Sequence, residues 1–266
     1  LYLDLGRAHE KNEETAEAIK SYLEAIRRSP QHAAAHLRLG ILYGRRQELA
    51  KAQAAFSTAE SLYRTLSNLE GHAEVLYQRS VVANKLGHFQ EASSLLEKVL
   101  EMARAGGNPH QQINALLQLS SVLHRKGDTA KAETWASEAI ELARSHGLEP
   151  LITRGLADLG NAYLVRGDRE RAEKCFRQSL EYARRLKSPR NEARALLSLG
   201  SLRIQYREPA EGIQHVEQGL AFYERGGYQS EKSQALLLLG RARRDLGDFD
   251  GALQAFKQQL ELAGKS

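Results

Sequence analysis

A small residue recurs at a fixed interval along the chain. It is Gly or Ser, and it stands at Gly6, Gly40, Ser80, Ser120, Gly160, Gly200 and Gly240. The first interval is 34 residues, and the five that follow are 40 residues each. Seven segments in one register indicate an array of internal repeats, in which each repeat packs only against its neighbours.

Each repeat carries two further marked positions. Twelve residues after the first small residue comes another, at Ala18, Ala52, Ala92, Ala132, Ala172, Gly212 and Ala252. Four residues later stands a larger apolar residue, at Tyr22, Phe56, Leu96, Phe176, Val216 and Phe256, with Ala136 as the exception. Residues four apart share one face of a helix, and two helices approach closely only where both lack bulk. The pattern predicts two antiparallel helices per repeat that cross at the small residues, with the larger residue filling the gap beside the crossing.

Glycine and aspartate mark the turn between the two helices of a repeat. A helix can end in the left-handed conformation without a steric penalty at glycine, which stands in this turn at Gly87, Gly127, Gly167 and Gly247. An aspartate follows as the expected N-cap of the second helix at Asp128, Asp168 and Asp248. Only five prolines interrupt a chain rich in Ala, Leu, Glu, Arg and Gln, which are strong helix formers.

The predicted fold is all-α: a solenoid of about seven helix–turn–helix repeats, with helices of roughly 14–18 residues. The repeats span about 1–32, 33–72, 73–112, 113–152, 153–192, 193–232 and 233–266. The linkers between repeats, such as those at 106–110 and 226–230, are short. We therefore expect residues 1–266 to form a single solenoid domain.

The first repeat carries the residues that identify a family. It contains Leu5, Gly6, Ala18, Tyr22, Ala25 and Pro30, with the next repeat 34 residues on. This set resembles the tetratricopeptide repeat (TPR) consensus, except that His9 stands where Tyr is usual. The 40-residue repeats resemble the longer variant found in groove-binding adaptors of the Pins type. The resemblance implies a right-handed superhelix whose first helices line a concave groove that binds a protein or peptide.

The family's groove positions can be carried across to this sequence. They fall on Tyr77, Lys85, Asn114, Arg125, Arg154, Asn161, Arg194, Ser201, Gln234, Arg241 and Arg244, together with the apolar or small Leu117, Ala157, Leu197 and Leu237. In related groove binders an asparagine at the position of Asn161 bonds an extended peptide backbone. Positive charge exceeds negative charge in this set, so the expected ligand is an acidic or mixed peptide. The alternative is that these residues are ordinary solvated helix faces.

One subclass of the family fits poorly. Carboxylate-clamp domains grip acidic C-termini with a Lys/Asn/Asn/Lys/Arg set spread over three repeats. Asn161 and Arg194 match this set in part, but Ala157 and Ser198 do not. We therefore do not expect a clamp of that type.

Composition narrows the function further. The net charge is +5 and the sequence pI is about 9.3, but the arginines are scattered, which disfavours nucleic acid as a partner. Cys175 is the only cysteine, and His32 and His36 lack a third ligand, so we expect no metal and no cofactor. No apolar run approaches the roughly 18 residues of a membrane span, and a cytoplasmic location is expected. No catalytic motif is present, so the chain itself is expected not to be an enzyme.

Three interpretations of the function remain open. The stretch from 77 to 203 resembles the TPR tails of bacterial serine/threonine protein kinases, which would place a kinase domain outside this chain. The alternatives are a peptide-sensing region of a transcriptional regulator and direct nucleic-acid binding, which predicts a steep salt dependence. The last helix, with Leu253, Phe256 and Leu260, is followed by only a few residues. It is expected to self-associate or to be covered by a partner or by more of a longer chain.

Overall fold

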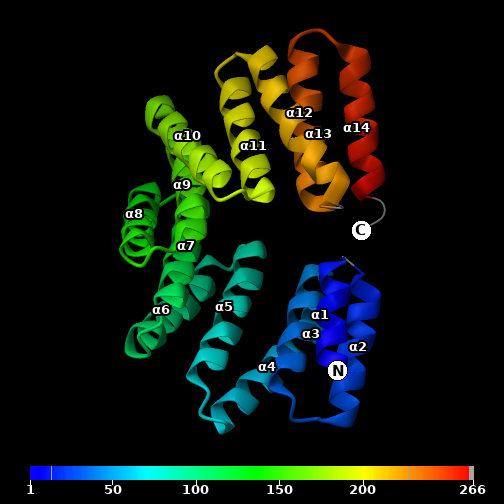
Figure 1. Cartoon of the computed structure of the whole chain (residues 1–266), viewed down its shortest axis with the longest axis vertical. Helices are drawn as coiled ribbons and strands as arrows, with labels where there is room; N and C mark the ends of the chain where they lie inside the picture. Colours follow the sequence, from blue (N-terminus) through cyan, green and yellow to red (C-terminus); the bar gives the residue numbers. More distant parts are fainter. Residues whose placement is uncertain (13, 227, 264–266) are drawn as a thin grey trace. The chain divides into compact units, whose positions relative to one another are not determined.

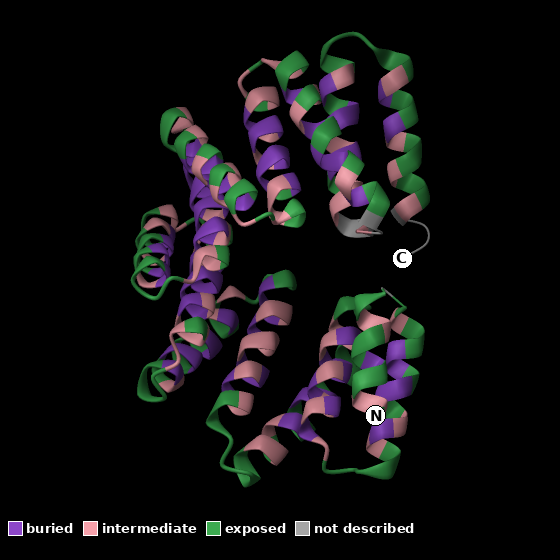
Figure 2. Cartoon of the chain, in the orientation of Figure 1, coloured by how far each residue is buried: buried purple, intermediate pink, exposed green. Residues whose placement is uncertain are grey.

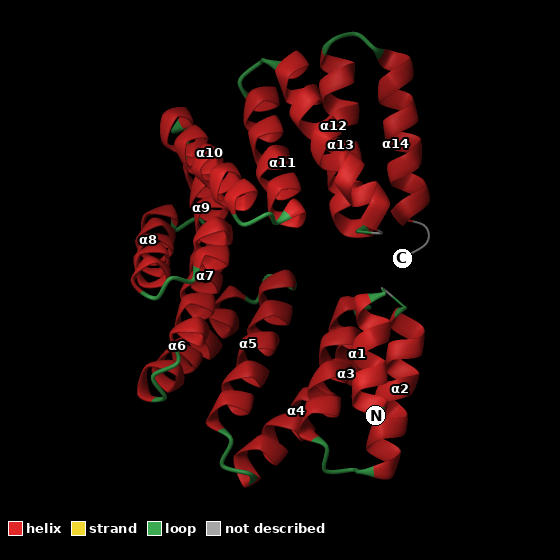
Figure 3. Cartoon of the chain, viewed as in Figure 1, coloured by secondary structure: helices red, strands yellow, loops and turns green. Residues whose placement is uncertain are grey.

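The computed structural model describes residues 1–12, 14–226 and 228–263, and within these ranges every regular element is an α-helix (Figure 3). The chain divides into two compact units, Leu1–Val122 and Leu123–Ser266. The all-α solenoid of helix pairs is confirmed, while the single-domain assignment stays a prediction. Of the linker expected at 226–230, Gly227 lies outside the described residues, as do residues 264–266.

Fourteen helices are present in the described part of the chain, and each repeat contributes two (Figure 1). Unit 1 contains α1 (Tyr2–Lys11), α2 (Thr15–Arg28), α3 (Ala33–Arg45), α4 (Leu49–Thr65), α5 (Leu69–Lys85) and α6 (Phe89–Ala105). The helix α7 (Pro109–Lys126) runs across the boundary between the units. Unit 2 contains α8 (Thr129–Ser145), α9 (Glu149–Val165), α10 (Arg169–Arg185), α11 (Pro189–Gln205), α12 (Pro209–Gly226), α13 (Gln229–Asp245) and α14 (Phe249–Ala263). The predicted helix lengths are right for every helix except α1, which has 10 residues, and α3, which has 13.

The first helices of unit 2 form its more tightly packed layer. The helix α11 contacts both α9 and α13, which are the first helices of the neighbouring repeats. In the described part of unit 2, no two of the second helices α8, α10, α12 and α14 make comparable contact. A stack of helix pairs that is tighter on one side curves toward that side. The first helices therefore line the inner side of unit 2.

In the repeats with glycine at the first small position, the larger apolar residue packs against that glycine. A Cβ atom added to Gly160 would lie 2.5 Å from the ring of Phe176, which is fully buried. The aromatic ring therefore packs directly over the glycine, rather than beside a crossing of two small residues. The exception Ala136 falls in the repeat that carries Ser120, where the first helix has more bulk and its partner has less. Small residues and large residues complement one another across the two helices.

A residue in the left-handed conformation ends the helices at intervals of 20 residues. Six of these residues are glycines, with φ of 80° at Gly87 and 78° at Gly167 as examples. Four are not glycine: Gln47, Ser67, Lys187 and Arg207, with φ between 49° and 64°. The predicted N-caps are confirmed, because Asp128, Asp168 and Asp248 each accept a hydrogen bond from the backbone N–H three residues on.

Candidate functional site

A stripe of unburied positions runs along the first helices α9, α11 and α13 of unit 2, and the residues between these positions are mostly buried (Figure 2). On each helix these positions are spaced i, i+4 and i+7, so they lie on one side of it. We call them the first-helix face: Arg154, Asp158 and Asn161 on α9, Arg194, Ser198 and Ser201 on α11, and Gln234, Leu238 and Arg241 on α13. Because α11 lies between α9 and α13, the three stripes form one continuous surface of unit 2.

The structure brings six of the predicted groove residues together on this face. They are Arg154, Asn161, Arg194, Ser201, Gln234 and Arg241. Two other positions carried across from the family, Ala157 and Leu197, are buried and belong to the core beneath the face. Arg125 is exposed near the end of α7, and Arg244 lies off the stripe with a guanidinium nitrogen 2.9 Å from Asp245 Oδ1. Those four residues are therefore not assembled on the face.

The remaining predicted residues lie in unit 1. Tyr77 and Lys85 are on α5, where Tyr77 is half-buried and Lys85 is exposed. Asn114 is half-buried on α7, with its Nδ2 3.0 Å from His110 Nδ1. Their part in binding stays a prediction.

An ion-pair network lies at the centre of the first-helix face. Arg194 Nη2 donates a hydrogen bond of 2.8 Å to Asp158 Oδ1, which links α11 to α9. Arg154 Nε lies 3.8 Å from the other oxygen, Asp158 Oδ2, one turn away on the same helix. Sequence reasoning named both arginines but missed Asp158. Its position four residues after Arg154 was the available signal, because residues at that spacing are neighbours on a helix.

His124, at the end of α7, faces the same carboxylate. Its Nδ1 is buried and has no hydrogen-bond partner among the described residues. Burial lowers the pKa of His124, and the charge of Asp158 partly offsets that effect. The imidazole is therefore neutral at pH 7, and the face carries three arginine charges against one aspartate charge. Arg241 is exposed and forms no ion pair within the described ranges.

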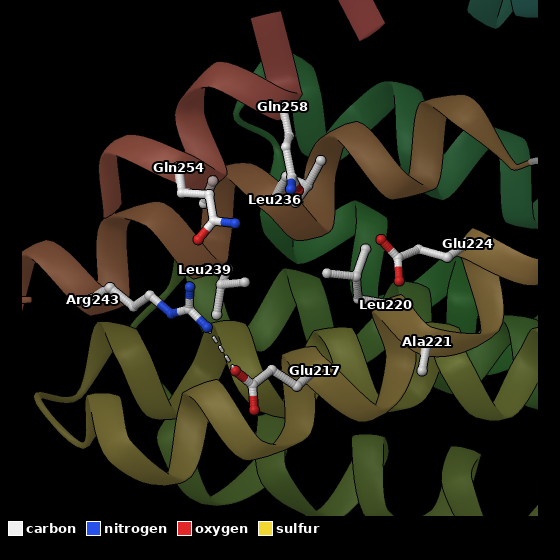
Figure 4. A pocket seen from close by; sticks show the side chains of 10 residues that line it. Glu217, Leu220, Ala221, Glu224, Leu236, Leu239, Arg243, Gln254 and Gln258 are labelled. Atoms are coloured by element: carbon white, nitrogen blue, oxygen red, sulfur yellow. Dashed lines mark hydrogen bonds and ion pairs between the residues drawn. The ribbon is translucent and has the colours of Figure 1, made fainter. Parts of the chain in front are cut away.

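The second-helix side of unit 2 carries two cavities at equivalent places in the repeats. One, of about 310 Å³, lies among α12, α13 and α14, and the other, of about 250 Å³, lies among α8, α9 and α10. Figure 4 shows the first, with Leu220 and Leu239 in its wall and Arg243 bonded to Glu217 at 3.0 Å. In the repeat between the two cavities, the residue equivalent to Tyr163 and Arg243 is Arg203.

Cys175 lines the smaller of these cavities. It is 7% exposed, and burial raises the pKa of its thiol to about 11. The thiol is therefore protonated at neutral pH, and a protonated thiol is a poor nucleophile and metal ligand.

The described ranges contain no group of three or more His, Cys, Asp or Glu side chains placed to hold a metal ion. None of the helices within them combines the length and apolarity needed to cross a bilayer. His36, half of the histidine pair considered from the sequence, bonds through Nε2 to the carbonyl oxygen of Pro30 at 2.9 Å.

The stacked helix pairs and the lined inner face define a helical-repeat solenoid. Tetratricopeptide repeat models match residues 3–67 and 157–225, residues 71–145 and residues 235–265. The chain belongs to the tetratricopeptide repeat family. No curated protein sequence matches it.

Several solved structures share the fold. A Rap protein complexed with competence and sporulation factor has a TM-score of 0.79 and 14% identity, over 99% of this chain and 74% of that one. Aspartyl phosphate phosphatase F from Bacillus subtilis has a TM-score of 0.78 and 13% identity, over 98% of this chain and 69% of that one. A Rap conjugation gene regulator of the plasmid pLS20, in complex with a peptide, has a TM-score of 0.74 and 18% identity, over 99% of this chain and 73% of that one. At these identities the likeness establishes a common fold.

Proposed function

We propose that the chain is a scaffold that binds an acidic peptide or protein segment on the first-helix face of unit 2. The observation that carries this proposal is the surface of mostly polar and basic side chains that the adjacent helices α9, α11 and α13 share. Three arginines on one surface, of which Arg194 and Arg241 are exposed, attract an acidic segment and speed its association, although each pair contributes only about 0–1 kcal/mol. Asn161 and Ser201 add groups that can bond a peptide backbone.

The solved structures support a peptide as the ligand. Two neighbours of similar fold, the Rap protein and the pLS20 regulator, were crystallised with competence and sporulation factor and with a peptide, respectively. This also favours the alternative in which the chain is the peptide-sensing part of a regulator. The assignment of the chain to the TPR tail of a bacterial serine/threonine kinase rests on sequence resemblance alone. A cytoplasmic location also stays a prediction.

Selection from a displayed library of random dodecapeptides tests this function. The selected peptides are measured by fluorescence anisotropy against the wild type and against Arg154→Glu/Arg194→Glu/Arg241→Glu. We expect acidic peptides to be selected, and we expect the triple variant to bind them at least tenfold more weakly, because about 1.4 kcal/mol is lost over three charge reversals.

The matched control reverses three exposed cations of the second helices, Lys174, Arg225 and Lys257, to Glu. It has the same net charge as the test variant, and it should retain wild-type affinity. Equal losses in the two variants would show that net charge, rather than the first-helix face, decides binding. A selection that yields no peptide, or neutral ones that bind both variants equally, would refute the proposal.

A further inference from the structure

An acid of this chain lies where an acidic ligand would bind. The Asp158 side chain is 17% exposed, whereas Arg194, which bonds it at 2.8 Å, is 45% exposed. The carboxylate therefore lies deeper than the guanidinium. A guanidinium has five N–H donors, and Arg194 uses one in its bond to Asp158. The outer edge of Arg194 remains accessible to a ligand.

The fold itself does not require an acid at this position. The equivalent residues of the next two repeats are Ser198 and Leu238, which carry no charge. An ion pair between partly exposed side chains also adds little to stability. The charge of Asp158 is therefore better explained by what the face binds than by how the repeats pack.

We infer that Asp158 is a specificity-determining residue of the first-helix face, which sets the charge of the anion that Arg194 accepts. This inference rests on the proposed function. A ligand anion on the outer edge of Arg194 shares one guanidinium with Asp158, so the two negative charges repel each other across it. The repulsion grows with the charge of the ligand. Asp158 therefore lowers the affinity of the face for a phosphate of higher charge by more than it lowers the affinity for a carboxylate, as in a Glu or Asp side chain.

Small anions test this directly. Acetate and inorganic phosphate are titrated at pH 7 into the 15N-labelled wild-type chain and into Asp158→Asn, and the arginine Nε–Hε signals are followed by NMR. The signal missing from Arg194→Gln identifies Arg194. We expect acetate to bind at Arg194 about threefold more tightly in Asp158→Asn, as a like charge at short range in a solvated site predicts. The gain for phosphate should be larger.

The control is Asp245→Asn, which removes the same charge at the last residue of α13, from a pair with Arg244 2.9 Å away. It should leave both affinities at Arg194 unchanged. Asp158→Ser, which copies the next repeat, should behave as Asp158→Asn does, and thermal melts confirm that each variant is folded.

Three results would overturn the inference. They are weaker or unchanged acetate binding in Asp158→Asn, an equal gain for acetate and phosphate, and no shift at Arg194 with either anion. Weaker binding would make Asp158 a residue that positions Arg194 for its ligand. The titration needs no peptide, so its outcome is separate from that of the library selection, which alone tests the proposed function.

Discussion

At the scale of single residues, the residue type predicts the left-handed backbone at some turns but not at others. The glycines at Gly87 and Gly167 indicate a left-handed turn, because only glycine adopts that conformation at no steric cost. Lys187 and Arg207 occupy equivalent turns, yet neither residue type points to a left-handed backbone. Only their place in the register, 20 and 40 residues after Gly167, marks them. These positions could therefore be predicted from the repeat but not from local propensity.

Replacing Lys187 with glycine should stabilise the chain. Lys187 has φ of 49°, which costs a non-glycine residue about 1 kcal/mol. Lys187→Gly is expected to raise the free energy of unfolding by up to about 0.5 kcal/mol, since relief of strain outweighs the greater freedom of glycine in the unfolded chain. Urea denaturation followed by circular dichroism measures the change.

Gly167→Ala is the matched opposite. Gly167 has φ of 78°, and a Cβ atom there would meet nothing within 4 Å, so backbone strain alone changes. This variant should lose about 1 kcal/mol. Stabilisation by Gly167→Ala, or destabilisation by Lys187→Gly, would show that these turns are not held in the left-handed conformation in solution.

Asp158 is the residue of the candidate site that the sequence did not single out. Family positions led to Arg154 and Arg194 but do not include a residue at 158. The helical spacing predicts the pair with Arg154, whereas the bond from Arg194 depends on how α11 lies against α9. Contacts between repeats require three-dimensional packing, and no local pattern encodes them.

At the scale of helices, the small-residue register predicted which elements pair, but not what fills the spaces between second helices. Tyr163, Arg203 and Arg243 occupy the same place in three successive repeats. Arg203 is 12% exposed there, and its guanidinium lies 2.6 Å from Glu173, 2.7 Å from Glu208 and 3.4 Å from Glu211. The equivalent residues Tyr163 and Arg243 line the two cavities of the neighbouring repeats.

Arg203→Met should destabilise the chain. Methionine keeps much of the side-chain volume but leaves Glu173 and Glu208 without their shared partner, and loss of one partner from a partly buried cluster costs about 2–3 kcal/mol. The measurement is urea denaturation at pH 7. Arg177→Met, which removes a well-exposed arginine 2.7 Å from Glu173, is the control and should change stability by less than about 0.5 kcal/mol.

The effect of Arg203→Met should also depend on pH. Hydrogen bonds from Arg169 and Arg203 lower the pKa of the Glu208 carboxyl. A lowered pKa contributes stability that is present above the unfolded-state value near 4.5 and is lost as the pH falls through the folded-state pKa. The difference between wild type and Arg203→Met should therefore shrink below pH 4.5. A difference that stays constant between pH 7 and pH 3 would mean that lost packing, rather than lost charge, causes the destabilisation.

At the scale of the whole molecule, the order of elements and the repeat register followed from the sequence, because each repeat contains its own crossing, turn and cap. The division into Leu1–Val122 and Leu123–Ser266 did not, since no change of composition or spacing marks it. It falls inside α7, a helix that the sequence pattern treats like any other. The first-helix face and its ion-pair network lie entirely within the second of these units.

A fragment spanning residues 109–266, which begins at α7, should therefore fold and keep the binding properties of the full chain. Repeats in a solenoid depend on their nearest neighbours, and this fragment contains every residue of the first-helix face together with His124, which faces Asp158. We expect helical circular dichroism and a cooperative thermal transition, with a Tm below that of the full chain because fewer interfaces remain. Peptides selected on the full chain should bind the fragment with an affinity within about threefold of that of the full chain, which corresponds to a difference of about 0.65 kcal/mol in binding free energy.

The complementary fragment, residues 1–108, is the control and should not bind them. Binding by residues 1–108, or a folded 109–266 fragment that has lost more than tenfold in affinity, would place part of the binding surface in unit 1, where Tyr77 and Lys85 lie.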